Sequence, residues 1–374
     1  MTAEKLFSAY IDANIILAAV AAIWMISKFA IAKSRWRGSF LTQLNLLYAV
    51  LVTVVLAPIV VLASDAINWF GMSSPAQGFS FSDFLVAQYL HGNIAMAPTK
   101  FEQLLMLRTE LTHEAVNLST WVSYTILGAL GAGFFAASLR NAKNIWRMSG
   151  MIHRSYVQRR IGRIDIRITH EARVPFSTRG IWRHYIVLPS ELLTQADDVR
   201  IAVSHEIQHV RQRDLIWEIA LELCRPIFFW NPAFIYCKRE VERMRELACD
   251  QQVLRRGVFA IRAYCECLLR VCRTSLSADR SNQIMTPSVP FAQLDGHACS
   301  SKSMAFLKRR VESILDASTK DAGRWYIVLL MIPVFAIVVN ASIAMRAPSD
   351  WSQDRLMLSA IVNLERLNNR SQSN

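Results

Sequence analysis

Four long apolar stretches constrain this 374-residue chain more than any other feature. A bilayer core about 30 Å thick requires roughly 20 mostly apolar residues in a helix. The stretches that meet this requirement are Ile11–Ala32, Leu41–Ala63, Leu118–Leu139 and Trp325–Met345. A buried core helix rarely stays apolar on every face over such a length, so we expect four transmembrane helices. The first stretch lacks a small-residue cleavage site and is expected to remain as an anchor.

The positions of lysine and arginine predict the orientation, because cytoplasmic loops carry an excess of these residues. The loop between the first two stretches is basic, with Lys28, Lys33, Arg35 and Arg37. Residues 64–117 hold two basic residues, Lys100 and Arg108, against five acidic ones, and are expected outside. Residues 140–324 hold 31 Lys+Arg and 19 Asp+Glu, a difference of +12 out of +13 for the chain. This block is therefore expected in the cytoplasm.

The sequence thus predicts a multi-pass protein of the bacterial inner membrane, with the N-terminus and the tail outside. The expected parts are two spans with a short cytoplasmic loop (1–63), an external loop (64–117), a third span (118–139), a cytoplasmic domain (140–324), a fourth span (325–345) and an external tail (346–374). A basic domain beside anionic lipid is the default for such a protein, so the bilayer is the expected partner. Direct nucleic-acid binding is not expected, because no helix-turn-helix or zinc-finger pattern is present.

The cytoplasmic block contains the sequence His205-Glu206-Ile207-Gln208-His209. Two histidines four residues apart on a helix face the same way and can bind one zinc ion, while the glutamate between them can act on a metal-bound water. Residues 192–213 contain no glycine or proline, and Asp197 and Asp198 lie where carboxylates favour a helix start. The motif predicts a catalytic zinc site.

A catalytic zinc site needs a third protein ligand and an open position for water. Downstream, Glu246 and Asp250 are four residues apart on a second predicted helix. We predict Glu246 as the third ligand and Asp250 as the acceptor of the free ring N–H of a ligand histidine. Glu240 and Glu242 are interpreted as part of a solvated ladder of opposite charges.

The seven cysteines all lie in the cytoplasmic block, where they are expected to stay reduced. Cys265, Cys267 and Cys272 could be read as a metal cluster, but none of the cysteines forms a C-x-x-C pair. Small apolar fillers in a hydrophobic helix are the preferred interpretation.

Several motifs together resemble a known family. They are S-H-E-I-Q-H-V-R-Q-R-D-L (204–215), W-N-P (230–232), R-E-L-A-C-D (245–250), and the upstream P-F-S-T-R-G (175–180) and Y-I-V-L-P (185–189). In these motifs the chain resembles the integral-membrane zinc peptidases typified by bacterial beta-lactam sensor-transducers. The resemblance implies four spans and a cytoplasmic α+β zincin-like (gluzincin) metalloprotease domain. It also implies one Zn²⁺ per chain, with His205, His209 and Glu246 as ligands and Glu206 as general base.

The resemblance departs after the fourth span, where those proteins continue into an external penicillin-binding domain. Only residues 346–374 follow here. We therefore expect this chain not to sense beta-lactams through such a domain.

Zinc proteases of this kind bind an extended substrate along the edge of a sheet. The resemblance places that edge at Tyr185, Ile186, Val187 and Leu188, and residues 164–169 alternate as a partner strand would. Zinc would lower the pKa of its water to roughly 7, and Glu206 would take the water proton and pass it to the leaving amine. His297, Tyr264 and His184 stay open as donors to the oxyanion.

Residues 215–237 are apolar enough to suggest a fifth span. Glu218, Glu222 and Arg225 argue against it, because each charge at mid-bilayer costs about 2.5–3.5 kcal/mol. A core or interfacial helix is preferred.

Three functions remain open from the sequence. The first is a zinc endopeptidase that cleaves a cytoplasmic protein, such as a transcriptional repressor or itself, in signal transduction. The second is a housekeeping membrane-protein quality-control protease, and the third is a non-catalytic signalling or assembly partner that keeps zinc for folding. A homodimer stays open in each case.

Overall fold

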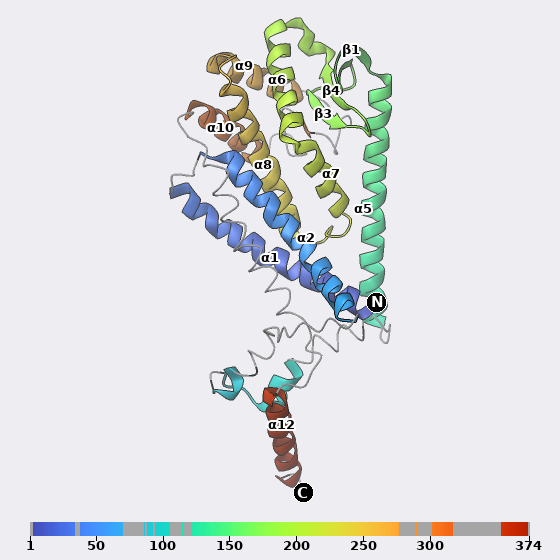
Figure 1. Cartoon of the computed structure of the whole chain (residues 1–374), viewed down its shortest axis with the longest axis vertical. Coiled ribbons are helices and arrows are strands. Elements are labelled where there is room, and N and C mark those ends of the chain that lie inside the picture. Colours follow the sequence, from blue (N-terminus) through green and yellow to red (C-terminus); the bar gives the residue numbers. More distant parts are fainter. Residues whose placement is uncertain are drawn as a thin grey trace. The chain divides into compact units, whose positions relative to one another are not determined.

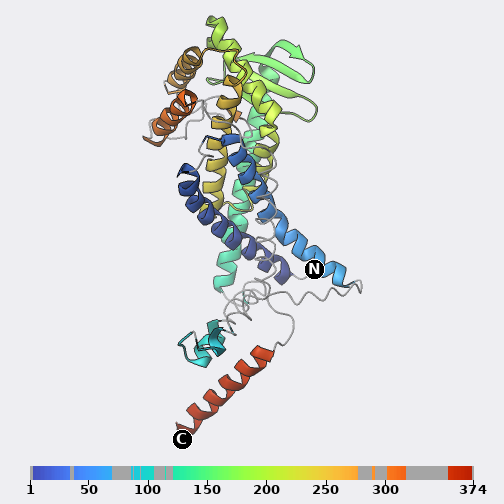
Figure 2. The same cartoon turned by 60° about the vertical axis from the view of Figure 1, so that its left-hand side comes forward.

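The computed structural model describes residues 3–33, 38–69, 86, 88–92, 94–104, 114, 121–276, 289–290, 301–316 and 353–372. Most of these are helical (Figure 1; Figure 2). The long helices are α1 (Ala3–Lys33), α2 (Phe40–Trp69), α5 (Trp121–Arg154), α6 (Ala196–Gln212), α7 (Asp214–Cys224), α8 (Pro232–Leu254), α9 (Ile261–Leu276), α10 (Ser301–Leu315) and α12 (Gln353–Gln372). The strands are β1 (Tyr156–Ile161), β2 (Ile164–Thr169), β3 (Phe176–Arg179), β4 (His184–Pro189) and β5 (Val289–Pro290), and a short 3-10 helix covers Ser190–Thr194.

Helices occupy the positions of the first three predicted spans. Two are long and apolar enough to cross a membrane, residues 9–29 within α1 and residues 121–154, which form α5. In α2 the apolar segment, residues 40–56, is too short to count as a third such helix. The fourth predicted span, 325–345, lies outside the described residues. The number of crossings and their direction therefore stay predictions.

The chain divides into two compact units. One comprises residues 1–23, 49–131 and 328–374, and in it α12 packs on the region 86–104. Its small core consists of Val86, Phe101, Leu358 and Val362. The backbone N–H of Thr99 donates to Glu365 (2.9 Å), and Arg366 pairs with Glu102 (2.6 Å). The tail and the loop that were both predicted outside therefore contact each other.

The other unit comprises residues 24–48 and 132–327 and contains a five-stranded sheet in the order β1-β2-β4-β3-β5. Strands β2 and β4 are parallel, and β3 is antiparallel to both β4 and β5. The prediction that residues 164–169 partner residues 185–188 is confirmed. The prediction that Tyr185, Ile186, Val187 and Leu188 form an edge is wrong, because β4 is hydrogen-bonded on both sides.

Alternate side chains of β4 face two different helices, which explains the central position of the strand. Ile186 and Leu188 pack with Ile166 and with Ala202 of α6. Val187 packs on the opposite face with Met148, Met151 and Ile152 at the end of α5. A run that is apolar at successive positions fits a strand buried on both faces, whereas a half-exposed strand alternates. The sheet is thus enclosed between α5 and α6 (Figure 1).

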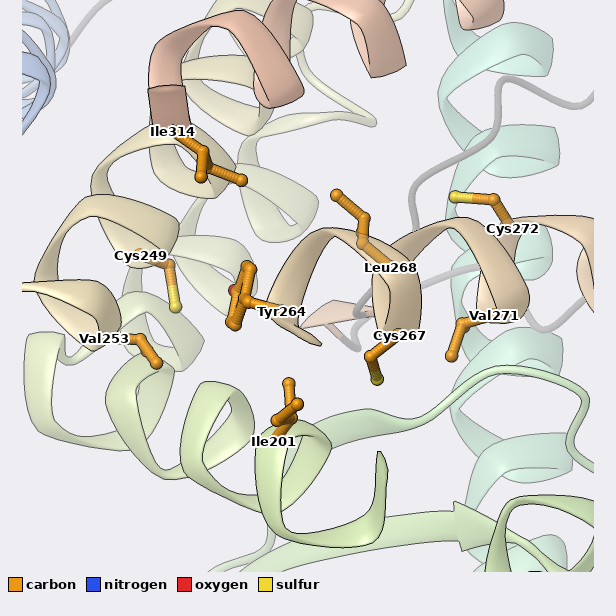
Figure 3. Packing of buried hydrophobic residues seen from close by; sticks show 9 residues of the cluster. All are labelled: Ile201, Cys249, Val253, Tyr264, Cys267, Leu268, Val271, Cys272 and Ile314. Carbon is orange, nitrogen blue, oxygen red and sulfur yellow. The ribbon is translucent and has the colours of Figure 1, made fainter. Parts of the chain in front are cut away.

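A second core joins the four helices α6, α8, α9 and α10. Tyr264 of α9 lies between Ile201 of α6, Cys249 of α8 and Ile314 of α10 (Figure 3). The cysteines Cys267 and Cys272 fill space in the same core, as the sequence predicted for small apolar fillers. This packing fixes the mutual position of the helices that carry the functional side chains.

The interpretation of Glu240 as a solvated residue is wrong. Its side chain is buried and pairs with Lys28 of α1 at 2.8 Å. Glu242 is largely buried as well, and it pairs with Lys238, four residues before it, at 2.6 Å. Arg243, three residues further along α8, also lies 3.9 Å from Glu240, but the closer partner, Lys28, comes from a helix 212 positions earlier, which local charge spacing could not reveal.

Candidate metal centre

Helix α6 brings His205 and His209 to one face. Both side chains are fully buried, and their Nε2 atoms lie 3.0 Å apart. The helix ends at Arg213, which adopts a left-handed conformation with φ 62° and donates its N–H to the carbonyls of His209 and Val210. This turn places Asp214, the first residue of α7, beside His209.

Glu246 of α8 faces the same pair. Its Oε2 lies 3.6 Å from Nε2 of His205, and its Oε1 lies 3.7 Å from Nε2 of His209. Ligand atoms that bind a tetrahedral zinc ion at 2.0–2.1 Å lie about 3.3 Å from one another. The three separations of 3.0, 3.6 and 3.7 Å scatter around that value, so the group has the spacing of a three-ligand site.

The W-N-P motif has a structural role in this arrangement. Asn231 caps α8, with its side-chain oxygen accepting the N–H of Ala233 at 2.9 Å, and Pro232 occupies the first turn. Both features favour a helix start at this point. The motif therefore sets where α8 begins and, through the helix, where Glu246 lies.

The other ring nitrogens of the two histidines are held by hydrogen bonds. Nδ1 of His209 contacts Oδ2 of Asp214 at 2.8 Å, and Nδ1 of His205 contacts the hydroxyl of Tyr264 at 2.8 Å. A carboxylate accepts only, and Tyr264 donates its own proton to Asp250 at 2.7 Å, so both Nδ1 atoms act as donors. Both Nε2 atoms are then lone-pair acceptors that face one another and Glu246. The two Nε2 atoms and the Glu246 carboxylate are thus all acceptors, and a cation placed among them would stabilise the arrangement.

Asp250 lies where the sequence predicted it, but its contact with His205 runs mainly through Tyr264. Its Oδ1 is 3.4 Å from Nδ1 of His205, longer than the path through the tyrosine hydroxyl. Arg310 of α10 donates two hydrogen bonds, of 2.7 and 2.8 Å, to the Asp250 carboxylate. Its guanidinium also lies 3.3 Å from Oε2 of Glu246. Against the effect of burial, this guanidinium holds the pKa of Asp250 below its usual value.

Glu206 is fully buried beside this group. Among the described residues neither of its carboxylate oxygens has a hydrogen-bond partner. Burial raises its pKa well above the usual value; the hydroxyl of Ser177 in β3, which is close to the carboxylate but outside hydrogen-bond geometry, opposes that rise, and the Glu246 carboxylate adds to it. Burying a carboxylate without a hydrogen-bond partner costs free energy unless a bound group or a water supplies one. Its position beside three convergent side chains that can bind a metal fits the role of a general base that acts on a bound water.

Both imidazoles are kept neutral, which is the form that binds metals. Burial lowers the pKa of His205 to about 3, with the Asp250 carboxylate opposing the change. Burial also lowers the pKa of His209, and here the hydrogen bond that the ring donates to the Asp214 carboxylate opposes the change.

Cys249 offers an alternative third ligand. With His205 and His209 it forms a buried group whose ligand atoms all lie within 4.8 Å of one another. Its Sγ, however, is 3.5 Å from Nδ1 of His205, on the side of the ring away from His209. Burial also raises the pKa of the Cys249 thiol well above its usual value, whereas a ligand must be a thiolate. Glu246 faces both Nε2 atoms and is the better placed of the two.

The three residues that the sequence left open as oxyanion donors lie in different places. Tyr264 is fully buried on the Nδ1 side of His205, away from the Nε2 pair. His184 lies in β4, where burial lowers its pKa. His297 lies outside the described residues.

Sequence reasoning missed Asp214, Tyr264 and Arg310 as partners of the site. Asp214 belongs to the quoted motif around His205, and its position directly after a helix end was a usable signal. Tyr264 and Arg310 come from helices that follow α8, and nothing in their local sequence distinguishes them from other core residues.

The fold and this group of side chains define a membrane-associated metallopeptidase class. The family model for the BlaR1 peptidase M56 matches residues 13–293, and the chain belongs to that metallopeptidase family. It is similar to the regulatory protein BlaR1 of Bacillus licheniformis, with 30% identity over 79 residues. It is also similar to the methicillin resistance mecR1 protein of Staphylococcus aureus, with 32% identity over 78 residues. These matches cover 21% and 20% of this chain, and the chain spans only 13% of the length of either relative.

Proposed function

We propose that the chain is a membrane-anchored zinc endopeptidase that cleaves a cytoplasmic protein as part of a regulatory pathway. The observation that carries the proposal is the convergence of His205, His209 and Glu246 beside the orphaned carboxylate of Glu206. Family membership supports peptidase chemistry, and the similarity to the regulatory protein BlaR1 supports the regulatory part.

His205, His209 and Glu246 would hold the metal, and the acceptor-only character of the group fits one divalent ion. When bound, the ion supplies Lewis acidity and makes a coordinated water more acidic. The Glu206 carboxylate would accept a proton from the attacking water and return it to the departing amine. Asp214, and Asp250 acting through Tyr264, keep the two imidazoles in the tautomer that leaves Nε2 bare.

The outer edge of β3 replaces β4 as the proposed site of substrate pairing. Ser177 of β3 lies near Glu206, and within the described residues β5 pairs with this edge at Phe176 and Ser177. An extended peptide that added to the same edge would receive backbone hydrogen bonds next to the general base.

The position of β5 favours a second candidate reaction, cleavage of the chain itself. Val289 and Pro290 come from the chain's own sequence and lie antiparallel to β3, as a substrate strand would. Mass spectrometry of purified protein would test this. A cut near residues 289–290 in the wild type, absent from the Glu206→Gln variant, is the expected result.

The contact between the tail and the loop supports the proposed four-span topology. Thr99 and Glu102 contact Glu365 and Arg366, so both segments lie on the same side of any membrane. If α5 crosses once after the loop, the chain must cross back before residue 353. The apolar stretch 325–345 lies in that interval of the sequence. The domain boundaries and the cytoplasmic position of residues 140–324 are part of the same proposal.

The direct test replaces Glu206 with Gln and measures cleavage of a labelled unfolded protein by the zinc-loaded, detergent-purified chain. We expect the rate to fall by about 10²–10⁴-fold, the usual contribution of a general base, while bound zinc stays unchanged. Glu191→Gln, which alters an exposed surface carboxylate, is the matched control and should keep full activity. Undiminished cleavage by Glu206→Gln contradicts the mechanism. Zinc retention without any cleavage by the wild type favours the non-catalytic alternative, and accumulation of many membrane proteins in a knockout favours the quality-control alternative.

A further inference from the structure

Helix α7 has two faces of opposite character. On one face Glu218 and Glu222 are buried and pair with Lys238 of α8 at 3.2 and 2.9 Å. Arg245 adds a further ion pair with Glu218 at 2.7 Å. All the acidic groups in the interior of α7 are therefore turned into the protein and neutralised there.

The opposite face of α7 is apolar and exposed. Residues 225–231 form the corner between α7 and α8. The exposed apolar side chains of α7, of this corner and of the start of α8 are Ile216, Ile219, Leu223, Ile227, Trp230 and Ile235. Leu223, in the last turn of α7, is 76% exposed. Contiguous apolar surface of this kind marks an interaction site and is unfavourable in water.

Two contacts fix the depth of this corner against α5. Nδ2 of Asn141 donates to the carbonyl of Glu222 at 2.7 Å. Further along α5, a Cβ at Gly133 would lie 2.1 Å from the ring of Phe229, so that ring packs directly on the helix backbone. Gly133 and Asn141 are eight residues apart, which is about 12 Å along a helix. Figure 1 shows α7 running beside α5.

The part of α5 that the corner contacts belongs to its candidate membrane span. The first charged residue of α5 is Arg140, and Phe134, Phe135 and Leu139 before it are all exposed. Asn141 therefore marks the end of the apolar surface, and Phe229 lies about 12 Å inside it. Helices that lie in the interface of a membrane bury their apolar face by about 5–10 Å, so the corner is at least that deep.

From these contacts we propose that the corner between α7 and α8, with the exposed apolar face of α7, is embedded in the lipid of the leaflet that α5 enters. This rests on the membrane anchoring in the proposed function but needs no metal chemistry. At 11 residues α7 is about 16 Å long, too short to span, so the chain enters the leaflet and returns. Arg225 pairs with Glu222, close to the level of Asn141, and can keep its charge near the headgroups.

The consequence for the metal centre is a short distance to the membrane surface. Asp214, which contacts His209, precedes Glu222 by eight residues, or about 12 Å of helix. The centre is thus held within roughly that distance of the level of Asn141. Protein segments close to the membrane surface are the substrates that such a position favours.

The experiment places a small fluorescent amino acid, one at a time, at Leu223, Phe135 and Ile181 of the full chain in phosphatidylcholine vesicles. Lipids with brominated acyl chains quench a probe in the hydrocarbon, and aqueous iodide quenches a probe in water. Ile181 is the matched control, because it is 86% exposed but lies at the tip of the β3–β4 hairpin. Bound zinc, measured on each labelled protein, verifies that the fold is intact.

We expect bromolipid quenching at Leu223 to reach at least about half of that at Phe135, as for a face buried below the headgroups, and iodide to have little effect. Ile181 should show the reverse. Iodide quenching at Leu223 would overturn the proposal, and so would the absence of quenching by either agent, since another protein segment would then cover the face. Failure of bromolipid quenching at Phe135 would instead contradict the membrane span of α5, which separates the two failures.

Discussion

The two sides of the histidine pair differ in how completely their polar groups are satisfied. On the Nδ1 side each ring nitrogen has a hydrogen-bond partner, and one chain of contacts runs from His205 through Tyr264 and Asp250 to Arg310. On the Nε2 side the acceptors of both histidines and of Glu246 face each other, and Glu206 has no hydrogen-bond partner among the described residues. Satisfied buried networks hold side chains in place, whereas unsatisfied buried groups are retained where a ligand completes them. The Nδ1 side therefore holds the two histidines in place and is called the positioning side. The Nε2 side is the proposed site of the metal ion and is called the binding side.

The largest effect should come from Glu246→Gln, which removes a charged group from the binding side. We expect zinc affinity to fall by more than the roughly 10–100-fold that is typical of changes behind the ligands. Competition with a chromogenic chelator measures it. Cys249→Ser is the control: if that variant loses affinity and Glu246→Gln does not, the ligand set is His205, His209 and Cys249.

A smaller effect is expected from Arg310→Gln on the positioning side. Arg310 holds Asp250 by two hydrogen bonds and lies beside Glu246, so its loss disturbs Glu246 and also the contacts that hold His205. Zinc affinity should fall by about 10–100-fold. Thermal unfolding of the metal-free protein separates a loss of fold from a loss of affinity. Arg309→Gln changes the exposed neighbouring arginine and should bind zinc like the wild type, and equal affinity in the two variants would show that the positioning side has no influence.

The smallest effect is expected from Tyr264→Phe. The change removes one hydroxyl but keeps the pair between Arg310 and Asp250. Asp250 already lies 3.4 Å from Nδ1 of His205 and can accept its proton directly after a small shift. We expect zinc affinity to change by less than about 10-fold, the lower limit for partners behind a ligand. A loss as large as that of Glu246→Gln would mean that the tyrosine is itself part of the binding side.

The sequence predicted the binding side better than the positioning side, for a physical reason. His205, Glu206 and His209 lie within one and a half turns of a single helix, so their spacing alone determines that they meet. Glu246 could be found because Leu247, Ala248 and Cys249 beside it are apolar and mark a core edge. The positioning side is assembled from three further helices, and its members come together only in the tertiary structure.

The sheet shows the same limit. Residues 164–169 and 184–189 were recognisable as strands from their own sequence. That β4 is not at an edge depends on its pairing with β2 on one side and with β3 on the other, and the strands' own sequences do not give this order. The burial of Glu240 depends in the same way on Lys28.

The central claim is that the Nε2 side holds one metal ion, and metal stoichiometry of the purified chain tests it most directly. Elemental analysis after dialysis against micromolar zinc should give one zinc per wild-type chain and per Glu206→Gln chain, and less than a tenth of that for the His205→Ala/His209→Ala double variant, since removing ligands removes the site. A wild-type chain without zinc, or a double variant that keeps it, would contradict the account.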